Sequence, residues 1–323
     1  MADELLMEKF KTGVSLLCWG YNEELLIEDF LQRALAFMDE IAEDYEVVFV
    51  NDGSTDRTGA IADDLAKRNP HLRVVHHEVN KNVGFACRTA VASARKEILF
   101  WQTVDWSYDL TNARIFLKLM GYYDVVQGIR PVPIRLVSYI PVLRSIYRVK
   151  SRSDNLQKAI ISLSNYYLLR ILFGVNFHDF QNVTFYRTAF VQGLEMTGTT
   201  SFVNPEFLIR AYGRGARFIE VPIPFIKRTL GEAKGTKLKT VIRSVKDTLK
   251  NWLRWGVVWR LQGKLSPEAG RIQRVAAPFA LDMDVLRLCL PLFNEFRHKA
   301  EDGSGQPPRK AQAPSQVATP RAQ

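Results

Sequence analysis

The feature that most constrains the fold is the stretch 47–56, where an apolar run ends abruptly in a carboxylate, a glycine and small polar side chains. Residues 47–50 have the continuous apolar character of a parallel strand buried on both faces. In open α/β sheets, ligands bind in the crevice beyond the carboxyl ends of the strands. The pattern therefore predicts that Asp52 lies at the mouth of a binding site, although a plain turn with a helix cap would use the same residue types.

A second unit is built in the same way. The apolar run Ile98-Leu99-Phe100-Trp101 continues through Gln102-Thr103-Val104 into Asp105-Trp106-Ser107-Tyr108-Asp109. Two parallel strands would then deliver carboxylates to one edge of a sheet. This repetition favours a binding site over a plain turn.

Short apolar strands alternate with helical patterns through the first 130 residues. This alternation predicts an α/β fold with a mostly parallel, twisted sheet flanked by helices. The expected strands are residues 14–19, 45–51, 72–77, 97–104 and 124–129, and the expected helices are 23–37, 57–68, 84–95 and 111–120. A helix at 156–173, a strand at 183–186, a helix starting near Pro205-Glu206 and a strand at 217–222 would complete the body.

Composition excludes several classes of protein. The chain has 323 residues, 47% of them hydrophobic and 24% charged, which matches a globular protein with a large core. Three widely spaced cysteines indicate neither a disulfide framework nor a zinc site, and they fit a reducing cytosolic compartment. The start of the chain does not have the pattern of a secretory signal. Residues 275–293 contain Asp282, Asp284 and Arg287, so we expect an amphipathic or core-docking segment there and not a membrane span.

The charge is distributed very unevenly along the chain. The net charge is +10, yet residues 1–110 carry 11 Lys and Arg against 20 Asp and Glu, which leaves a strongly basic remainder. Between Lys227 and Arg260 there are ten basic residues and two acidic ones. Such a density attracts phosphates, anionic lipid head groups or nucleic acid. Nucleic acid ranks lowest, because the charge flanks apolar segments and no nucleic-acid-binding module is recognisable.

Two basic segments are also apolar. The first, residues 131–152, combines three prolines with large apolar side chains. The second, residues 236–260, has helical spacing, with Leu238, Val241, Ile242, Val245, Leu249, Trp252 and Leu253 on one face and Lys239, Arg243, Lys246, Lys250 and Arg254 on another. This pattern is typical of a helix on a membrane surface, but it equally fits a helix that packs its apolar side on the domain. The tail after residue 299 has a disordered composition.

Four motifs in order carry a family resemblance. Tyr21-Asn22-Glu23-Glu24, Asn51-Asp52-Gly53-Ser54-Thr55-Asp56, Asn80-Lys81-Asn82-Val83-Gly84 and the Asp105 segment resemble family 2 glycosyltransferases of the GT-A fold. The second half is similar to the dolichyl or polyprenyl phosphate sugar synthases. That similarity is carried by residues 128–130, 177–182, 204–207, 210–215 and 220–225 and by the basic loop 227–234. The resemblance spans roughly residues 12–245.

The resemblance implies roles for individual residues. Nucleotide-sugar binding falls to Tyr21, Asn22, Glu23, Asp52, Gly53, Gly84, Val104 and Asp105. A Mg²⁺ or Mn²⁺ ion would be held by Asp105 with Asp109, because Ser107 stands where the family has its second metal-site aspartate. The catalytic residues would be Asp105, Asp179 and Glu206, with Glu206 orienting Arg130 and Asp179 either a base or an orienter. The acceptor phosphate would contact Arg130, Arg144, Arg228 and Lys234.

These roles lead to an expected organisation and function. Residues 1–230 would form the catalytic domain, with a donor half at 12–130 and an acceptor half at 131–230; residues 231–298 would form membrane-surface helices, and 299–323 a disordered tail. The expected reaction moves a hexose from a UDP- or GDP-sugar to polyprenyl phosphate with inversion, in a cytoplasmic protein bound peripherally to the membrane. Two alternatives stay open: a sugar or glycolipid hydroxyl as the acceptor, and a non-catalytic subunit with a degenerate metal site at Ser107. Whether the chain forms a homo-oligomer is also open.

Overall fold

The structure is a computed structural model that describes residues 8–129, 156–223, 238–266, 272–275, 281, 283–289 and 291–292. The chain forms two units, Met1–Leu288 and Cys289–Gln323, and the whole sheet belongs to the first. The predicted acceptor residues Arg130, Arg144, Arg228 and Lys234 lie outside the described residues, as do the segment 131–152 and the tail 299–323.

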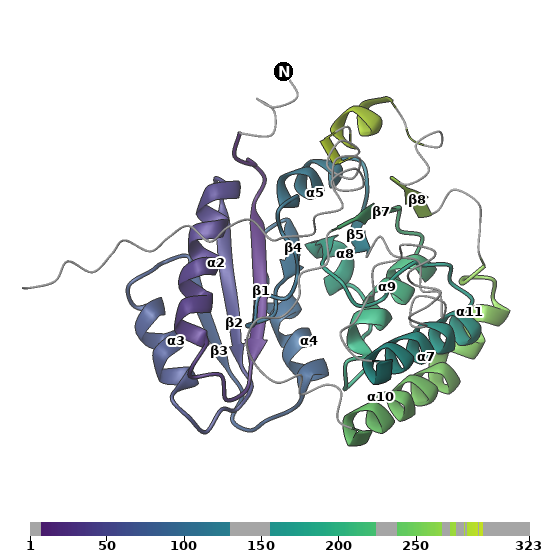
Figure 1. The fold of residues 1–323 in the computed structure, drawn as a ribbon, viewed down its shortest axis with the longest axis horizontal. Coiled ribbons are helices and arrows are strands. Elements are labelled where there is room, and N and C mark those ends of the chain that lie inside the picture. The colour runs from purple at the N-terminus through teal and green to yellow at the C-terminus, as the bar shows by residue number, and fades with distance from the viewer. Residues whose placement is uncertain are drawn as a thin grey trace, which may run out of the picture. The chain divides into compact units, whose positions relative to one another are not determined.

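One eight-stranded sheet has the order β3-β2-β1-β4-β6-β5-β7-β8 (Figure 1). The strands are β1 (Val14–Gly20), β2 (Tyr45–Asn51), β3 (Leu72–His76), β4 (Ile98–Trp101), β5 (Val125–Ile129), β6 (Thr184–Arg187), β7 (Phe218–Pro222) and β8 (Ile272–Arg274). β6 is antiparallel to β4 and β5, while the other pairs are parallel. The prediction of a mostly parallel sheet is confirmed. Sequence reasoning missed β8, because its three residues are too few for a periodic signal.

The helices are α2 (Ile27–Ile41), α3 (Thr58–Ala66), α4 (Val83–Ser93), α5 (Ala113–Leu119), α7 (Leu156–Phe173), α8 (Thr188–Gln192), α9 (Val203–Gly213) and α10 (Leu238–Asn251). A π-helical turn, η3 (Trp252–Gly256), joins α10 to α11 (Val257–Leu261). The expected bounds of 156–173 are confirmed for α7. α2 begins four residues later than predicted, because the N–H groups of Glu23 and Glu24 bond to Thr58 and Asp56 in the next loop.

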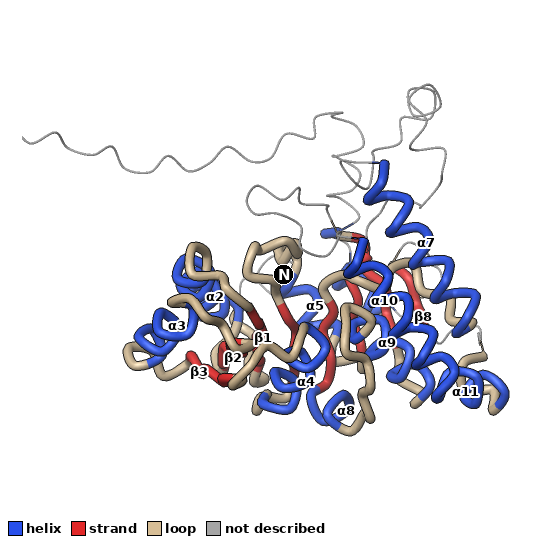
Figure 2. Tube along the Cα trace, turned by 90° about the horizontal axis from the view of Figure 1, so that it is seen from below, coloured by secondary structure: helices blue, strands red, loops and turns tan. Residues whose placement is uncertain are grey.

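Helices cover both faces of the parallel half of the sheet (Figure 2). The chain moves outward from β1 to β3 and then returns to β4, and right-handed crossovers place α2 and α3 on one face and α4 on the other. Every residue of β2 is buried, as the apolar run predicted. In the register, Gly20 lies opposite Asn51. The loops that follow β1 and β2 therefore leave the sheet side by side.

Glu46 lies near the start of β2, at the opposite end of the strand from the loop that follows it. It offers a test of how the free energy of unfolding depends on pH. Its carboxylate accepts hydrogen bonds from Ser15 Oγ at 2.7 Å, the Arg95 N–H at 2.6 Å and Arg73 at 2.8 Å. Burial alone would raise the pKa of Glu46, but these bonds outweigh it and the net pKa is lowered. A lowered pKa stabilises the fold above the unfolded value of about 4.3, and this contribution is lost as the pH falls below it.

We therefore expect Glu46→Gln to lower the free energy of unfolding at pH 7 by about 1 kcal/mol. The difference between wild type and variant should shrink at about pH 3.5, because the carboxyl of the unfolded chain, with its pKa of about 4.3, is then mostly protonated and the contribution of the lowered folded pKa decreases. Urea unfolding at the two pH values measures both differences. An equal difference at both would contradict the electrostatic explanation.

Candidate active site

The loops that follow β1 and β2 are joined by hydrogen bonds. The Asn22 N–H donates to Ser54 Oγ at 3.0 Å, and the Thr55 N–H donates to Asn22 Oδ1 at 2.9 Å. The Glu23 N–H donates to Thr58 Oγ1 at 2.8 Å. Two motifs that are about thirty residues apart in the sequence thus form one structural unit, with Tyr21 39% exposed beside it. The structure brings these predicted donor-binding residues together.

Left-handed backbone conformations gather at this edge of the sheet. Among the described residues other than glycine, positive φ angles occur at Asn22 (54°), Asn82 (73°) and Trp106 (52°), which lie in the loops after β1, β3 and β4. The loop after β2 contains Gly53, with φ 69°. A Cβ on Gly53 would lie 2.3 Å from the carbonyl carbon of Val79, so only glycine fits. Such strained positions cost about 1–3 kcal/mol each and cluster at functional sites.

Asp52 is held by the loop that follows β3. Its side chain is buried, and Oδ1 lies 2.6 Å from His77 Nδ1 and accepts a hydrogen bond from the Lys81 N–H at 3.0 Å. On its other side, His77 Nε2 lies 2.9 Å from Thr89 Oγ1 on α4. Sequence reasoning did not select His77, because a lone histidine after a strand has no distinctive spacing. The structure shows that it fixes the carboxylate expected to read the nucleotide base.

The loop that contains Val104 and Asp105 is organised by Gln102. Gln102 Oε1 accepts hydrogen bonds from the N–H groups of Thr103 at 2.9 Å and Tyr108 at 3.1 Å, and Nε2 donates to the Tyr108 carbonyl at 2.9 Å. The Ser107 hydroxyl lies 2.7 Å from Thr103 Oγ1. Ser107, at the position of the family's second metal-site aspartate, therefore has a role within the loop.

Trp106 anchors this loop to α2. Its indole packs against Phe30 and Phe37, at centroid distances of 5.7 and 5.8 Å. The guanidinium carbon of Arg33 lies 4.1 Å from the indole centroid, and burial lowers the pKa of Arg33. The contacts offset the cost of the positive φ angle, and they fix the backbone immediately after Asp105.

The chemistry of the donor set fits a hard divalent cation. Asp105 is half-buried in the loop, and Asp109 is buried with its Oδ1 accepting the Thr111 N–H at 2.8 Å. Mg²⁺ is commonly bound by one or two carboxylates together with the phosphates of the substrate. Within the described ranges, no group of three His, Cys, Asp or Glu side chains could hold an ion. The fit therefore rests on two carboxylates, and the remaining ligands of such an ion would come from a diphosphate.

Glu206 is fully buried at the start of α9, and its carboxylate is surrounded by donors. It accepts hydrogen bonds from the N–H groups of Thr197 at 3.1 Å and Gly198 at 2.6 Å, from Thr197 Oγ1 at 2.9 Å and from Arg210 Nε at 2.9 Å. Glu206 thus holds Arg210 and the 197–200 loop in place. Its predicted role of orienting Arg130 stays a prediction, because Arg130 lies outside the described residues. Arg210 was not among the candidate site residues, although it lies one helical turn after Glu206 on α9.

Asp179 is buried beside β5. Its Oδ1 accepts the N–H groups of Phe180 at 2.8 Å and Gln181 at 3.2 Å, and its carbonyl accepts Nε2 of Gln127 at 2.6 Å. The neighbouring His178 lies against the buried Glu220, with 2.6 Å between Nδ1 and Oε2. These contacts fix the position of Asp179, and its assignment as base or orienter stays a prediction.

Gly84 is required by packing at the start of α4. A Cβ there would lie 2.5 Å from the carbonyl carbon of Thr199, in the 197–200 loop. The same loop is held from the other side by Asp247 of α10, whose Oδ2 accepts the N–H groups of Thr199 at 2.8 Å and Thr200 at 2.9 Å. The 197–200 loop thus links α4, α9 and α10, and its close approach explains the glycine without a ligand.

Comparison with known proteins places the chain in a family. The sequence model described as glycosyl transferase family 2 matches residues 20–177. Dolichyl-phosphate hexose transferase of Haloferax volcanii is 31% identical over 216 residues, which cover 66% of this chain and 82% of that protein. This chain belongs to glycosyltransferase family 2.

Other relatives in family 2 extend the comparison. Undecaprenyl-phosphate mannosyltransferase of Micrococcus luteus is 26% identical over 250 residues, covering 75% of this chain and 93% of that protein. The resemblance to polyprenyl phosphate sugar synthases is thereby confirmed. Glycosyltransferase AglD of Haloferax volcanii is 26% identical over 272 residues, and the chain spans only 41% of its length.

A solved structure supports the fold. Glucosyl-3-phosphoglycerate synthase of Mycobacterium tuberculosis, in complex with Mn²⁺, UDP-glucose and phosphoglyceric acid, superposes with a TM-score of 0.55 at 14% identity. The match covers 78% of this chain and 84% of that structure. At this identity the likeness concerns the fold alone, and the predicted GT-A fold is confirmed.

Proposed function

We propose that this family 2 protein transfers a hexose from a UDP- or GDP-sugar to polyprenyl phosphate, with inversion, at the cytosolic surface of a membrane. Two relatives bear the names dolichyl-phosphate hexose transferase and undecaprenyl-phosphate mannosyltransferase, which support a polyprenyl phosphate acceptor. The loops after β1, β2 and β4 bring Asn22, Asp52 and Asp105 to one edge of the sheet, where a donor would bind.

The observation that carries the membrane part of the proposal is the orientation of α10. Asp247, Thr248 and Asn251 are buried against the domain. Ile242 and Leu249 of α10 and Leu253 of the following turn η3 are 46%, 40% and 73% exposed. Val241, Val245 and Trp252 of the same face are half-buried, so only part of the apolar side packs on the domain. The exposed part supports contact with a membrane.

Basic and apolar side chains surround that exposed row. The basic side chains of Lys239, Arg243, Lys246, Lys250 and Arg254 are all exposed. Figures 1 and 2 both show α7 alongside α10, and α7 adds Tyr167 and Ile171, which are 47% and 68% exposed. Basic residues near an anionic membrane contribute about 1 kcal/mol each, which would hold such a surface at the bilayer.

No helix in the part of the chain that the structure describes is long and apolar enough to cross a bilayer.

The proposed mechanism assigns separate work to the two halves of the sheet. Asp52, fixed by His77, would bind the base, and Asp105 with Asp109 would hold a Mg²⁺ or Mn²⁺ ion. When bound, that ion neutralises the charge that develops on the leaving diphosphate. An oxygen of the lipid phosphate would attack the anomeric carbon from the face opposite the diphosphate. The new carbon–oxygen bond forms as the bond to the diphosphate breaks, which inverts the configuration.

The acceptor in this reaction needs positive charge more than it needs a base. A phosphomonoester has its second pKa at about 6, so a lipid phosphate is mostly dianionic at neutral pH and carries no proton for a base to remove. Guanidinium groups match phosphate oxygens in bidentate fashion. Arg130, Arg144, Arg228 and Lys234 remain our candidates for this contact.

Transfer of radiolabelled sugar to polyprenyl phosphate tests the reaction. We expect label to enter the organic phase only when polyprenyl phosphate, a suitable nucleotide sugar and Mg²⁺ or Mn²⁺ are all present. Label that stays aqueous with every UDP- and GDP-sugar and both metals would contradict the proposal. Transfer that continues without lipid phosphate but needs a free hydroxyl would support a hydroxyl acceptor, with Asp179 as base. Calorimetry that detects no nucleotide binding would support a non-catalytic subunit.

The exposed apolar row of α10 and η3 gives a prediction about membrane binding. Replacing Leu249 and Leu253 together by serine should weaken binding to anionic vesicles about 30- to 150-fold, because partial burial of two leucines in the interface contributes about 2–3 kcal/mol. Vesicle sedimentation measures the partition coefficient. Leu25→Ser is the matched control, because Leu25 is 89% exposed in the donor half and should not affect binding. Equal binding by wild type and the double variant would contradict the membrane assignment.

A further inference from the structure

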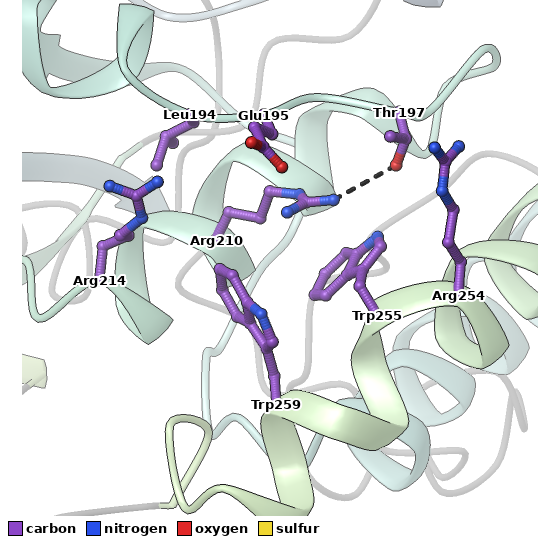
Figure 3. Close-up of a pocket in the computed structure, with 8 residues that line it drawn as sticks. All are labelled: Leu194, Glu195, Thr197, Arg210, Arg214, Arg254, Trp255 and Trp259. Carbon is purple, nitrogen blue, oxygen red and sulfur yellow. Dashed lines mark hydrogen bonds between the residues drawn. The ribbon is translucent and has the colours of Figure 1, made fainter.

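A cavity of about 240 Å³ lies between α9, the segment 194–197 and the helical turns η3 and α11 (Figure 3). It is lined by Leu194, Glu195, Thr197, Arg210, Arg214, Arg254, Trp255 and Trp259. None of the predicted donor or metal residues lines it. Two residues of its wall, Thr197 and Arg210, form hydrogen bonds with Glu206, one of the predicted catalytic residues.

Arg210 is fixed in the wall of this cavity. Its side chain is 6% exposed, with Nε donating to Glu206 and a terminal nitrogen donating to Thr197 Oγ1 at 3.3 Å. The guanidinium carbon lies 4.1 Å from the ring centroid of Trp255 and 5.3 Å from that of Trp259. An arginine has five N–H donors, and these two bonds leave donors for a ligand. Arg210 is therefore a preorganised donor.

Two further arginines flank Arg210. Figure 3 shows Arg214 and Arg254 on opposite sides of it, with Glu195 nearby. Arg214 and Arg254 are exposed, and neither forms an ion pair with any residue that the structure describes. Glu206 compensates the charge of Arg210, so Arg214 and Arg254 leave the cavity positive even with Glu195 present. The cavity therefore favours an anion.

The backbone that supplies one side of the cavity is unusual. Arg254 and Trp255 belong to η3, a five-residue π-helical turn within an otherwise α-helical segment. Such turns are rare and frequently mark functional sites. Gly256 in the same turn is required, because a Cβ there would lie 2.5 Å from the indole of Trp252. The turn is thus held by close packing, and it presents Arg254 and Trp255 to the cavity together.

We propose that this cavity binds the phosphate group of a small ester that also carries a hydroxyl group. The guanidinium groups of Arg210, Arg214 and Arg254 would donate to the phosphate oxygens. Glu195, the one acidic residue of the lining, would accept a hydrogen bond from the hydroxyl and disfavour more highly charged anions. Sites for drug-sized ligands measure about 300–1,000 Å³, so this cavity suits a head group and not a whole nucleotide sugar. The ester could be soluble or the head group of a lipid.

Calorimetric titration with glycerol 3-phosphate and with inorganic phosphate tests the site. We expect Arg214→Gln and Arg254→Gln each to weaken glycerol 3-phosphate binding about tenfold, the loss typical of one charge-assisted hydrogen bond at a partly exposed position. Glu195→Ala, which removes the acceptor of the hydroxyl, should abolish the preference for glycerol 3-phosphate over inorganic phosphate. Arg243→Gln, an exposed charge of α10 outside the lining, is the matched control and should leave binding unchanged. Phosphate bound at the donor edge would be unaffected by all four variants.

Vesicles of phosphatidylglycerol or of phosphatidylcholine distinguish the two sources. A lipid head group is the ligand if Arg214→Gln weakens binding to phosphatidylglycerol vesicles and glycerol 3-phosphate competes with them. A soluble ester is the ligand if the vesicles do not compete. The inference is overturned if wild type does not bind glycerol 3-phosphate at about 10 mM, or if Arg214→Gln and Arg254→Gln lose no more affinity than Arg243→Gln. The transfer assay is independent of either result.

Discussion

Replacing Asp105 by asparagine should lower kcat/KM for sugar transfer about 1,000-fold while leaving the free energy of unfolding nearly unchanged. The loss follows from removing the negative charge that would hold a metal ion against the donor diphosphate. Removing one preorganised stabilising group from an active site costs about 2.7–4 kcal/mol. The fold should survive, because Trp106 keeps its contacts with Phe30 and Phe37 and asparagine is nearly isosteric.

Asp109→Asn provides the matched control. The asparagine oxygen can still accept the Thr111 N–H, so this variant loses charge without losing the turn. We expect about a tenfold loss in kcat/KM and a higher Mn²⁺ concentration for half-maximal rate, since Asp105 would keep its charge and continue to hold the ion. Added Mn²⁺ should restore much of the activity of Asp109→Asn and little of that of Asp105→Asn. An Asp105→Asn variant with more than a tenth of wild-type kcat/KM would exclude Asp105 as the principal metal ligand.

The arrangement of the loops expected to bind the donor could be predicted, because local sequence dictates it. Residues 45–51 form β2 with the predicted bounds, since a continuous apolar run has few alternatives to a buried strand. Parallel strands that end together then bring Asn22 and Asp52 side by side. The partner of Asp52 could not be predicted, because only the three-dimensional path of the loop between β3 and α4 brings His77 next to it.

The orientation of α10 could not be predicted for a different reason. Periodicity identifies which face of a helix is apolar, but not which face packs on the domain. Asp247 and Asn251 decide the outcome through long-range bonds to the 197–200 loop, and no local pattern contains those bonds. The predicted membrane-surface helix and the predicted packed helix have the same sequence signature.

Replacing Glu206 by alanine should lower the free energy of unfolding by about 3–5 kcal/mol. Breaking a buried ion pair leaves its partner as an uncompensated buried charge, and Arg210 is only 6% exposed. The N–H groups of Thr197 and Gly198 also lose their acceptor. Urea unfolding measures the effect, and Thr197→Val, which removes one hydroxyl donor, is a control that should cost about 1 kcal/mol.

A double variant separates the ion pair from the other bonds. Replacing Glu206 by leucine and Arg210 by methionine removes both charges, so it should be less destabilising than Glu206→Ala, with the remaining loss arising from the unpaired N–H groups. The same variants test catalysis. If Glu206 acts by orienting the 197–200 loop, the transfer rate of each variant should fall as its free energy of unfolding falls. The kcat of the folded fraction should then keep its wild-type dependence on pH. A 1,000-fold loss of kcat in Glu206→Ala with no change in stability would instead make Glu206 a catalytic residue.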